Sequence, residues 1–131
     1  MKKISFLILR IGLAIVFIWI GISILKNPEA WGAFLKPWAL ALLPIPLKEA
    51  MLGTAILDLV IGGLLLSNTL IWLAALLGSI HLLVVLITSG IDDVTVRDIG
   101  LLAATLALFI EFLPDRLIPK TETQRELSQN L

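Results

Sequence analysis

Residues 4–25 read ISFLILRIGLAIVFIWIGISIL, an apolar run in which Arg10 is the one charged residue. A helix that crosses a lipid bilayer needs about 20 mainly apolar residues. The run is apolar on every side, whereas the helices of a soluble bundle carry charged side chains on their outer face. This stretch therefore predicts a membrane-spanning helix.

Three more stretches have the same character, and with the first they predict four spans, at about residues 4–25, 50–67, 69–89 and 94–113. The turn at Ser67 and Asn68 is so short that the second and third spans must be antiparallel neighbours. The predicted fold is all-α: an integral membrane, antiparallel four-helix bundle over residues 1–117, followed by a polar C-terminal tail over 118–131.

The composition of the whole chain agrees with a membrane protein. Of the 131 residues, 59% are hydrophobic and 15% are charged, whereas an ordinary soluble domain is about 45–50% apolar and about 25% charged. The chain has a net charge of zero, so it has no excess of basic residues of the kind that marks a nucleic-acid-binding protein. Because there is no cysteine, disulfides, thiol redox pairs and thiolate metal sites are excluded.

The start of the chain and the link after the first span need separate interpretation. Lys2 and Lys3 followed by an apolar run imitate a signal peptide, but the run is too long for one and no cleavage site follows, so we expect a retained first helix. The link over residues 26–49 contains tryptophans and two prolines that interrupt helices. It is predicted to lie at the membrane interface or to dip into the mouth of the bundle.

The distribution of basic residues gives a weak prediction of topology. Four spans place both termini on one side. That side carries Lys2, Lys3, Arg116, Lys120 and Arg125, and the opposite side carries Lys26, Lys36, Lys48 and Arg97. The positive-inside bias favours a multi-pass protein of the cell membrane with cytoplasmic termini.

Asp58 and His81 are ionisable residues near the middle of two spans. Placing a charged side chain at the bilayer centre costs about 2.5–3.5 kcal/mol, so each is a candidate functional residue. Both share a helix face with small residues, which is typical of a side that packs inside a bundle. Since the two spans are antiparallel neighbours, we expect the two side chains to meet. Such a pair is either a proton carrier or a structural contact.

Arg10 and Glu111 are charged residues nearer the ends of the first and fourth spans. Both lie displaced towards the terminal side of the membrane, and the faces that carry them are lined with small residues. We expect an ion pair between Arg10 and Glu111 that closes the first helix against the fourth. The alternative is that Arg10 reaches the lipid headgroups.

At the opposite membrane face, four charged residues lie at one level: Lys26, Glu49, Arg97 and Asp98. They either surround a mouth or form solvated helix ends. The sequence has none of the motifs of metalloproteases, phosphate loops, dinucleotide-binding folds or serine hydrolases, so no catalytic residue and no metal site is assigned.

Several motifs resemble the DoxX-like family of small four-helix membrane proteins. They are LRIGLA at residues 9–14, FIWIGI at 17–22, KNP at 26–28, GGLLL at 62–66 after Asp58, and RDIGLL at 97–102. The resemblance covers about residues 8–113. The turn at Ser67 and Asn68 departs from the family pattern. The resemblance implies a membrane protein associated with quinone-linked redox chemistry, in which the electron carrier is a bound quinone or belongs to a partner protein.

These observations leave three hypotheses of function. The first is a redox-associated subunit that holds a quinone between its helices, with Asp58, His81 and Arg10 as buried donors and Trp19 and Trp72 as weaker candidates for packing against the ring. The second is a non-catalytic structural or assembly protein in the bilayer. The third is a small transporter, which needs a homo-oligomer because four helices are few for a pore.

Overall fold

The structure is a computed structural model that describes residues 1–118 and 122–130. Its regular elements are helices α1 (Lys3–Lys26), α2 (Pro28–Gly32), α3 (Pro37–Ala41), α4 (Leu47–Leu66), α5 (Ile71–Ser89), α6 (Val96–Glu111), the 3₁₀ helix η1 (Asp115–Leu117) and α7 (Glu122–Gln129). The predicted all-α class is confirmed.

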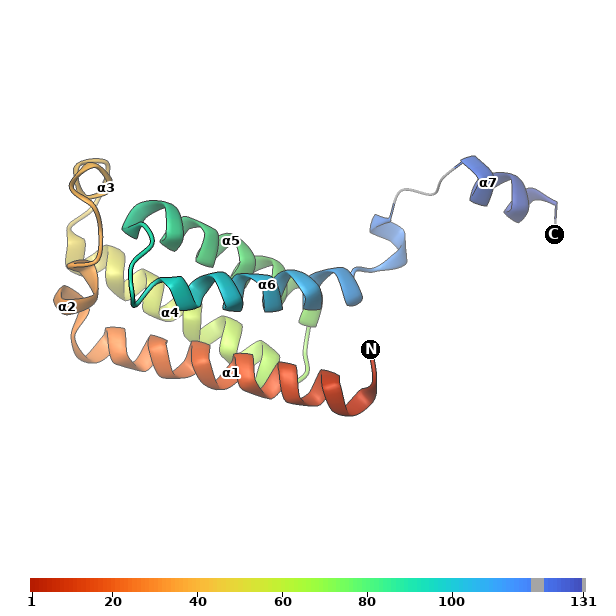
Figure 1. Cartoon of the computed structure of the whole chain (residues 1–131), viewed down its shortest axis with the longest axis horizontal. Helices are drawn as coiled ribbons and strands as arrows, with labels where there is room; N and C mark the ends of the chain where they lie inside the picture. Colours follow the sequence, from red (N-terminus) through yellow and green to blue (C-terminus); the bar gives the residue numbers. More distant parts are fainter. Residues whose placement is uncertain (119–121, 131) are drawn as a thin grey trace.

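Helices α1, α4, α5 and α6 lie side by side and alternate in direction (Figure 1). The short helices α2 and α3 and the α5–α6 link lie at one end, which we call the loop end. The N-terminus and the α4–α5 turn lie at the other, which we call the terminal end. Among these helices, α1 packs mainly on α4 and α5 mainly on α6, so the arrangement is two tightly packed helix pairs.

Three helices, α1, α4 and α5, are long and apolar enough to cross a membrane. Helix α6 has 16 residues and is about 24 Å long at 1.5 Å per residue, less than the bilayer core of about 30 Å. The fourth span predicted over residues 94–113 is therefore shorter as a helix, because the chain leaves helical geometry after Glu111 and reaches Pro114.

The contact between α1 and α4 depends on glycine. A methyl group added to Gly62 would lie 2.5 Å from Ile18 Cγ1 and 3.1 Å from the backbone oxygen of Ala14. A methyl group on Gly21 would meet Leu59 and the backbone oxygen of Ala55 in the same way. These small residues let the two helix backbones approach closely, a device that is common in membrane helix pairs.

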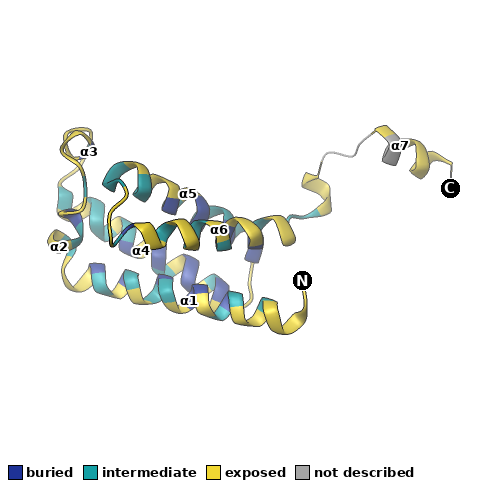
Figure 2. Cartoon of the chain, in the orientation of Figure 1, coloured by how far each residue is buried: buried dark blue, intermediate teal, exposed yellow. Residues whose placement is uncertain are grey.

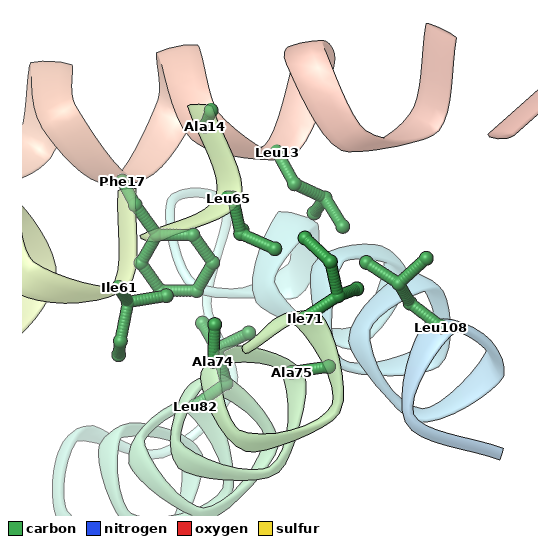
Figure 3. Close-up of a cluster of buried hydrophobic side chains, with 10 residues drawn as sticks. All are labelled: Leu13, Ala14, Phe17, Ile61, Leu65, Ile71, Ala74, Ala75, Leu82 and Leu108. Atoms are coloured by element: carbon green, nitrogen blue, oxygen red, sulfur yellow. The ribbon is translucent and has the colours of Figure 1, made fainter. Parts of the chain in front are cut away.

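A cluster of buried apolar side chains from all four long helices lies between the two pairs (Figure 3). It consists of Leu13, Ala14, Phe17, Ile61, Leu65, Ile71, Ala74, Ala75, Leu82 and Leu108. A buried hydrogen bond reinforces the α5–α6 pair, in which Ser79 Oγ donates to Thr105 Oγ1 at 2.9 Å. The outward positions are exposed (Figure 2), and many are large and apolar, such as Ile8, Ile56, Ile80 and Ile110.

Arg10 joins α1 to the C-terminal end of α4. Its Nη1 donates to the carbonyl oxygens of Leu65 at 2.6 Å and Leu66 at 2.8 Å, and its guanidinium lies 5.7 Å from the centre of the Phe6 ring. The last carbonyls of a helix lack intrahelical donors and carry partial negative charge. The side chain is buried, so Arg10 acts as a cap for α4 and does not reach outward to headgroups.

The predicted Arg10–Glu111 ion pair is wrong. Glu111 Oε1 instead accepts from the Met1 amino group at 2.6 Å. The sequence prediction paired Arg10 with a charged side chain or with lipid headgroups. The carbonyls that end α4 accept from its Nη1 instead, its buried Nε has no hydrogen-bond partner, and Glu111 contacts the Met1 amino group.

We expect Arg10→Met to lower the free energy of unfolding by about 1.5–3 kcal/mol, the usual value of hydrogen bonds to a charged group. The measurement is unfolding in mixed detergent followed by circular dichroism. Lys2→Met removes one exposed positive charge at the same end of the molecule and is the control. Equal stability of the two variants would contradict the capping role.

Candidate functional site

A cavity of 520 Å³ lies between the helix pairs towards the loop end. Helix α1 lines it with Val16, Phe17, Ile20 and Ile24; α4 with Ala50, Met51, Thr54 and Asp58; α5 with His81, Leu82, Val84, Val85, Thr88 and Ser89; and the α5–α6 link and α6 with Val94, Thr95, Arg97, Asp98 and Leu101. Small-molecule sites usually have volumes of about 300–1,000 Å³ and mostly apolar walls with a few polar groups. The cavity has this character.

Asp58 and His81 meet in this cavity, as the sequence predicts. His81 Nε2 lies 3.1 Å from Asp58 Oδ1. Asp58 is 2% exposed, so the carboxyl group depends on His81 for a polar partner. The short α4–α5 turn fixes the register that brings α4 and α5 residues of equal depth together. A carboxyl group and an imidazole at this distance can share a proton and present it to a bound molecule.

The link between α1 and α4 lies at the loop end of the cavity, and of the two positions that the sequence left open, the membrane interface and the mouth of the bundle, its contacts favour the second. Trp31, Phe34, Leu35 and Leu43 line the cavity from this link. The backbone N–H of Lys36 donates to the carbonyl of Thr88 at 2.9 Å, which fastens the link to the end of α5. The cover is therefore aromatic on its inner side and attached at its centre.

The link between α5 and α6 forms the other rim of the mouth. Asp92 Oδ1 accepts from the backbone N–H groups of Val94 and Thr95, each at 2.8 Å. The hydrogen bond from Thr95, and to a smaller extent the one from Val94, hold the pKa of the Asp92 carboxyl below its ordinary value of 3.8. Thr95 is buried, and its Oγ1 donates to the carbonyl of Gly90 at 2.6 Å. The start of α6 is thus held in one conformation.

The structure separates into two pairs the four charged residues for which the sequence left open a mouth or solvated helix ends. Arg97 and Asp98 line the cavity. Glu49 is exposed and outside the lining, and Lys26 borders a separate shallow groove with Trp19. The mouth alternative therefore fits Arg97 and Asp98, and the alternative of solvated helix ends fits the exposed Lys26 and Glu49.

The two tryptophans predicted to pack on a ring do not line the cavity. Trp19 is 71% exposed on the outside of α1, and Trp72 lies near the α4–α5 turn at the opposite end. The aromatic residues that do line it are Phe17, Trp31 and Phe34. The sequence feature that could have indicated Trp31 and Phe34 as lining residues is their position in a link rich in aromatic residues and proline.

The part of the chain that the structure describes contains no group of three or more histidine or acidic side chains able to hold a metal ion. No family model, curated protein or solved structure matches the chain. The likeness to the DoxX-like family therefore rests on its sequence motifs.

Proposed function

We propose that the chain is a multi-pass membrane protein whose cavity binds a lipophilic molecule with a polar ring, of the quinone class. The observation that carries this proposal is the Asp58–His81 pair in the wall of a largely apolar cavity with an aromatic cover. The carbonyl oxygen of a quinone accepts hydrogen bonds, while its ring and isoprenoid tail match apolar walls.

The membrane setting is supported by the exposed surface. Large apolar side chains point outward from all four long helices, including Ile99, Leu106 and Ile110 on α6. Soluble monomers rarely expose apolar patches larger than a few hundred Å². We therefore keep α6 as a fourth span that is shorter than the others, which bilayer thinning accommodates at modest cost. The termini are cytoplasmic in this proposal, and the cavity opens towards the other side.

The proposed ligand agrees with the quinone-linked redox role that the DoxX-like resemblance implies. Reduction of a quinone to the quinol takes two electrons and two protons. The proposal assigns proton donation to the Asp58–His81 pair and the supply of electrons to a redox protein in the same membrane.

Quenching of tryptophan fluorescence by a short-chain quinone tests the binding. With the protein in lipid nanodiscs, decylubiquinone is expected to give a saturable quenching component from Trp31, added to the linear quenching caused by quinone dissolved in the lipid. Trp31→Phe should remove the saturable component. Trp19→Phe, which changes a lipid-facing tryptophan, should keep it. Linear quenching alone in the unaltered protein would refute quinone binding.

A structural role is the second candidate, and one observation favours it. Asp58 lies 3.1 Å from His81, and a contact of this kind between α4 and α5 stabilises helix association whether or not a ligand is present. The two functions differ in what happens to quinone binding when the pair is replaced by apolar residues of similar volume.

A further inference from the structure

Asp98 of α6 faces the same cavity as the Asp58–His81 pair. It lines the cavity wall and interacts electrostatically with both His81 and Asp58. Helices α4, α5 and α6 thus contribute Asp58, His81 and Asp98 to a single space, which α6 also lines with Arg97. Asp98 lies in the first turn of α6, so it is nearer the loop end than the other two.

The three groups differ in their access to water. The side chain of Asp58 is 3% exposed and that of His81 is 12% exposed. Asp98 is half-buried, and its neighbour Arg97 is exposed at the rim. The order from the interior to the surface is therefore Asp58, His81, Asp98 and then solvent.

We infer that Asp98 is the group through which the Asp58–His81 pair exchanges protons with water. The inference rests on the proposed function, because a site that reduces a quinone consumes protons. The positions of the three side chains do not depend on that function. A proton from water binds a carboxylate oxygen of Asp98 and passes to the imidazole of His81 through water in the cavity, because Asp98 and His81 line the same space without a direct contact. Only O–H and N–H bonds are made and broken, and no electron moves in this step.

The other charged groups near this path lie on its outer side. Arg97 adjoins Asp98 on α6, and Asp92 of the α5–α6 link also interacts with Asp98. Among the residues that line the cavity, α1 and the α1–α4 link contribute no charged side chain.

The single histidine of the chain makes the test direct. The protein is prepared without a histidine tag, labelled with ¹⁵N-histidine and placed in nanodiscs. The rate at which the imidazole N–H of His81 exchanges with water is then measured by NMR. Asp98→Asn is expected to slow this exchange by about a hundredfold, the lower end of the range for a positioned acid or base. Asp98→Glu should restore it.

Asp93→Asn is the matched control, because Asp93 is an exposed carboxylate of the same rim that does not line the cavity. It should leave the exchange rate unchanged. An unchanged rate in Asp98→Asn, or equal slowing in Asp93→Asn, would overturn the inference. Quinone quenching is recorded on the same samples. If Asp98→Asn keeps the saturable quenching but exchanges slowly, proton delivery is separate from quinone binding. If the unaltered protein shows no saturable quenching, quinone binding is refuted, and the exchange result still stands.

Discussion

Asp58→Leu or His81→Leu alone is expected to lower the free energy of unfolding by about 3–5 kcal/mol, and the double replacement is expected to restore most of that loss. A single replacement leaves one buried polar group without its partner, which lies 3.1 Å away in the unaltered protein. The double replacement removes both groups and fills the space with apolar atoms. Unfolding in mixed detergent measures all three variants.

Quinone binding in the double variant separates the two proposed functions. In the ligand-binding proposal, the saturable quenching is lost although stability has returned. In the structural alternative, the quenching of the double variant matches that of the unaltered protein. Stability losses that simply add in the double variant would show that the two groups do not act as a pair.

Ser79 and Thr105 provide the matched control. They form another buried polar contact between two helices, at 2.9 Å, and they lie outside the cavity lining. The double variant Ser79→Ala/Thr105→Val should therefore keep quinone binding. Loss of binding in this variant would mean that quinone affinity follows general packing of the helices and not the Asp58–His81 pair.

Gly62→Ala is expected to destabilise the protein by about 1–3 kcal/mol, the usual cost of overpacking. The added methyl group would lie 3.1 Å from both the Ala14 oxygen and the Ile18 nitrogen, and backbone atoms cannot turn aside as a side chain can. The α1–α4 pair must therefore separate. Thermal unfolding followed by circular dichroism is the measurement.

The adjacent Gly63→Ala is expected to have the opposite sign. A methyl group there meets nothing within 4 Å, and alanine is favoured over glycine inside a helix by about 0.5–1 kcal/mol. Two neighbouring glycines of one helix thus give opposite results because Gly62 is buried against α1, whereas Gly63, about 100° further around the helix, is exposed. Equal effects at Gly62 and Gly63 would contradict the close approach of α1 and α4.

The sequence was sufficient to predict the parts of the fold that depend on hydropathy and on short turns. Long apolar runs give the positions of α1, α4 and α5, and the tight turn after Ser67 sets the register that brings Asp58 to His81. The fourth span was overestimated because an apolar run shows where a chain can be buried but not where its helical geometry ends.

The errors at the candidate site concern partners that hydropathy does not encode. Arg10 binds backbone carbonyls, which every residue possesses, so no residue type marked them. Trp19 was a weak candidate for packing on a ring because of its residue type, but its side chain lies on the exposed side of α1. The cover formed by Trp31 and Phe34 depends on how a long link folds back, and local patterns do not determine this.

The cap that Arg10 provides for α4 also bears on how the protein is made. The acceptors of Arg10 lie 55 and 56 residues further along the chain, so they have not yet been synthesised when the first helix leaves the ribosome. In the proposed membrane setting, Arg10 lies between the bilayer centre and the terminal side, where an unpaired charge costs part of the about 2.5–3.5 kcal/mol that applies at the centre. Association of α1 with α4 supplies the hydrogen bonds of Arg10, so the first helix carries this cost only until α4 has been inserted beside it.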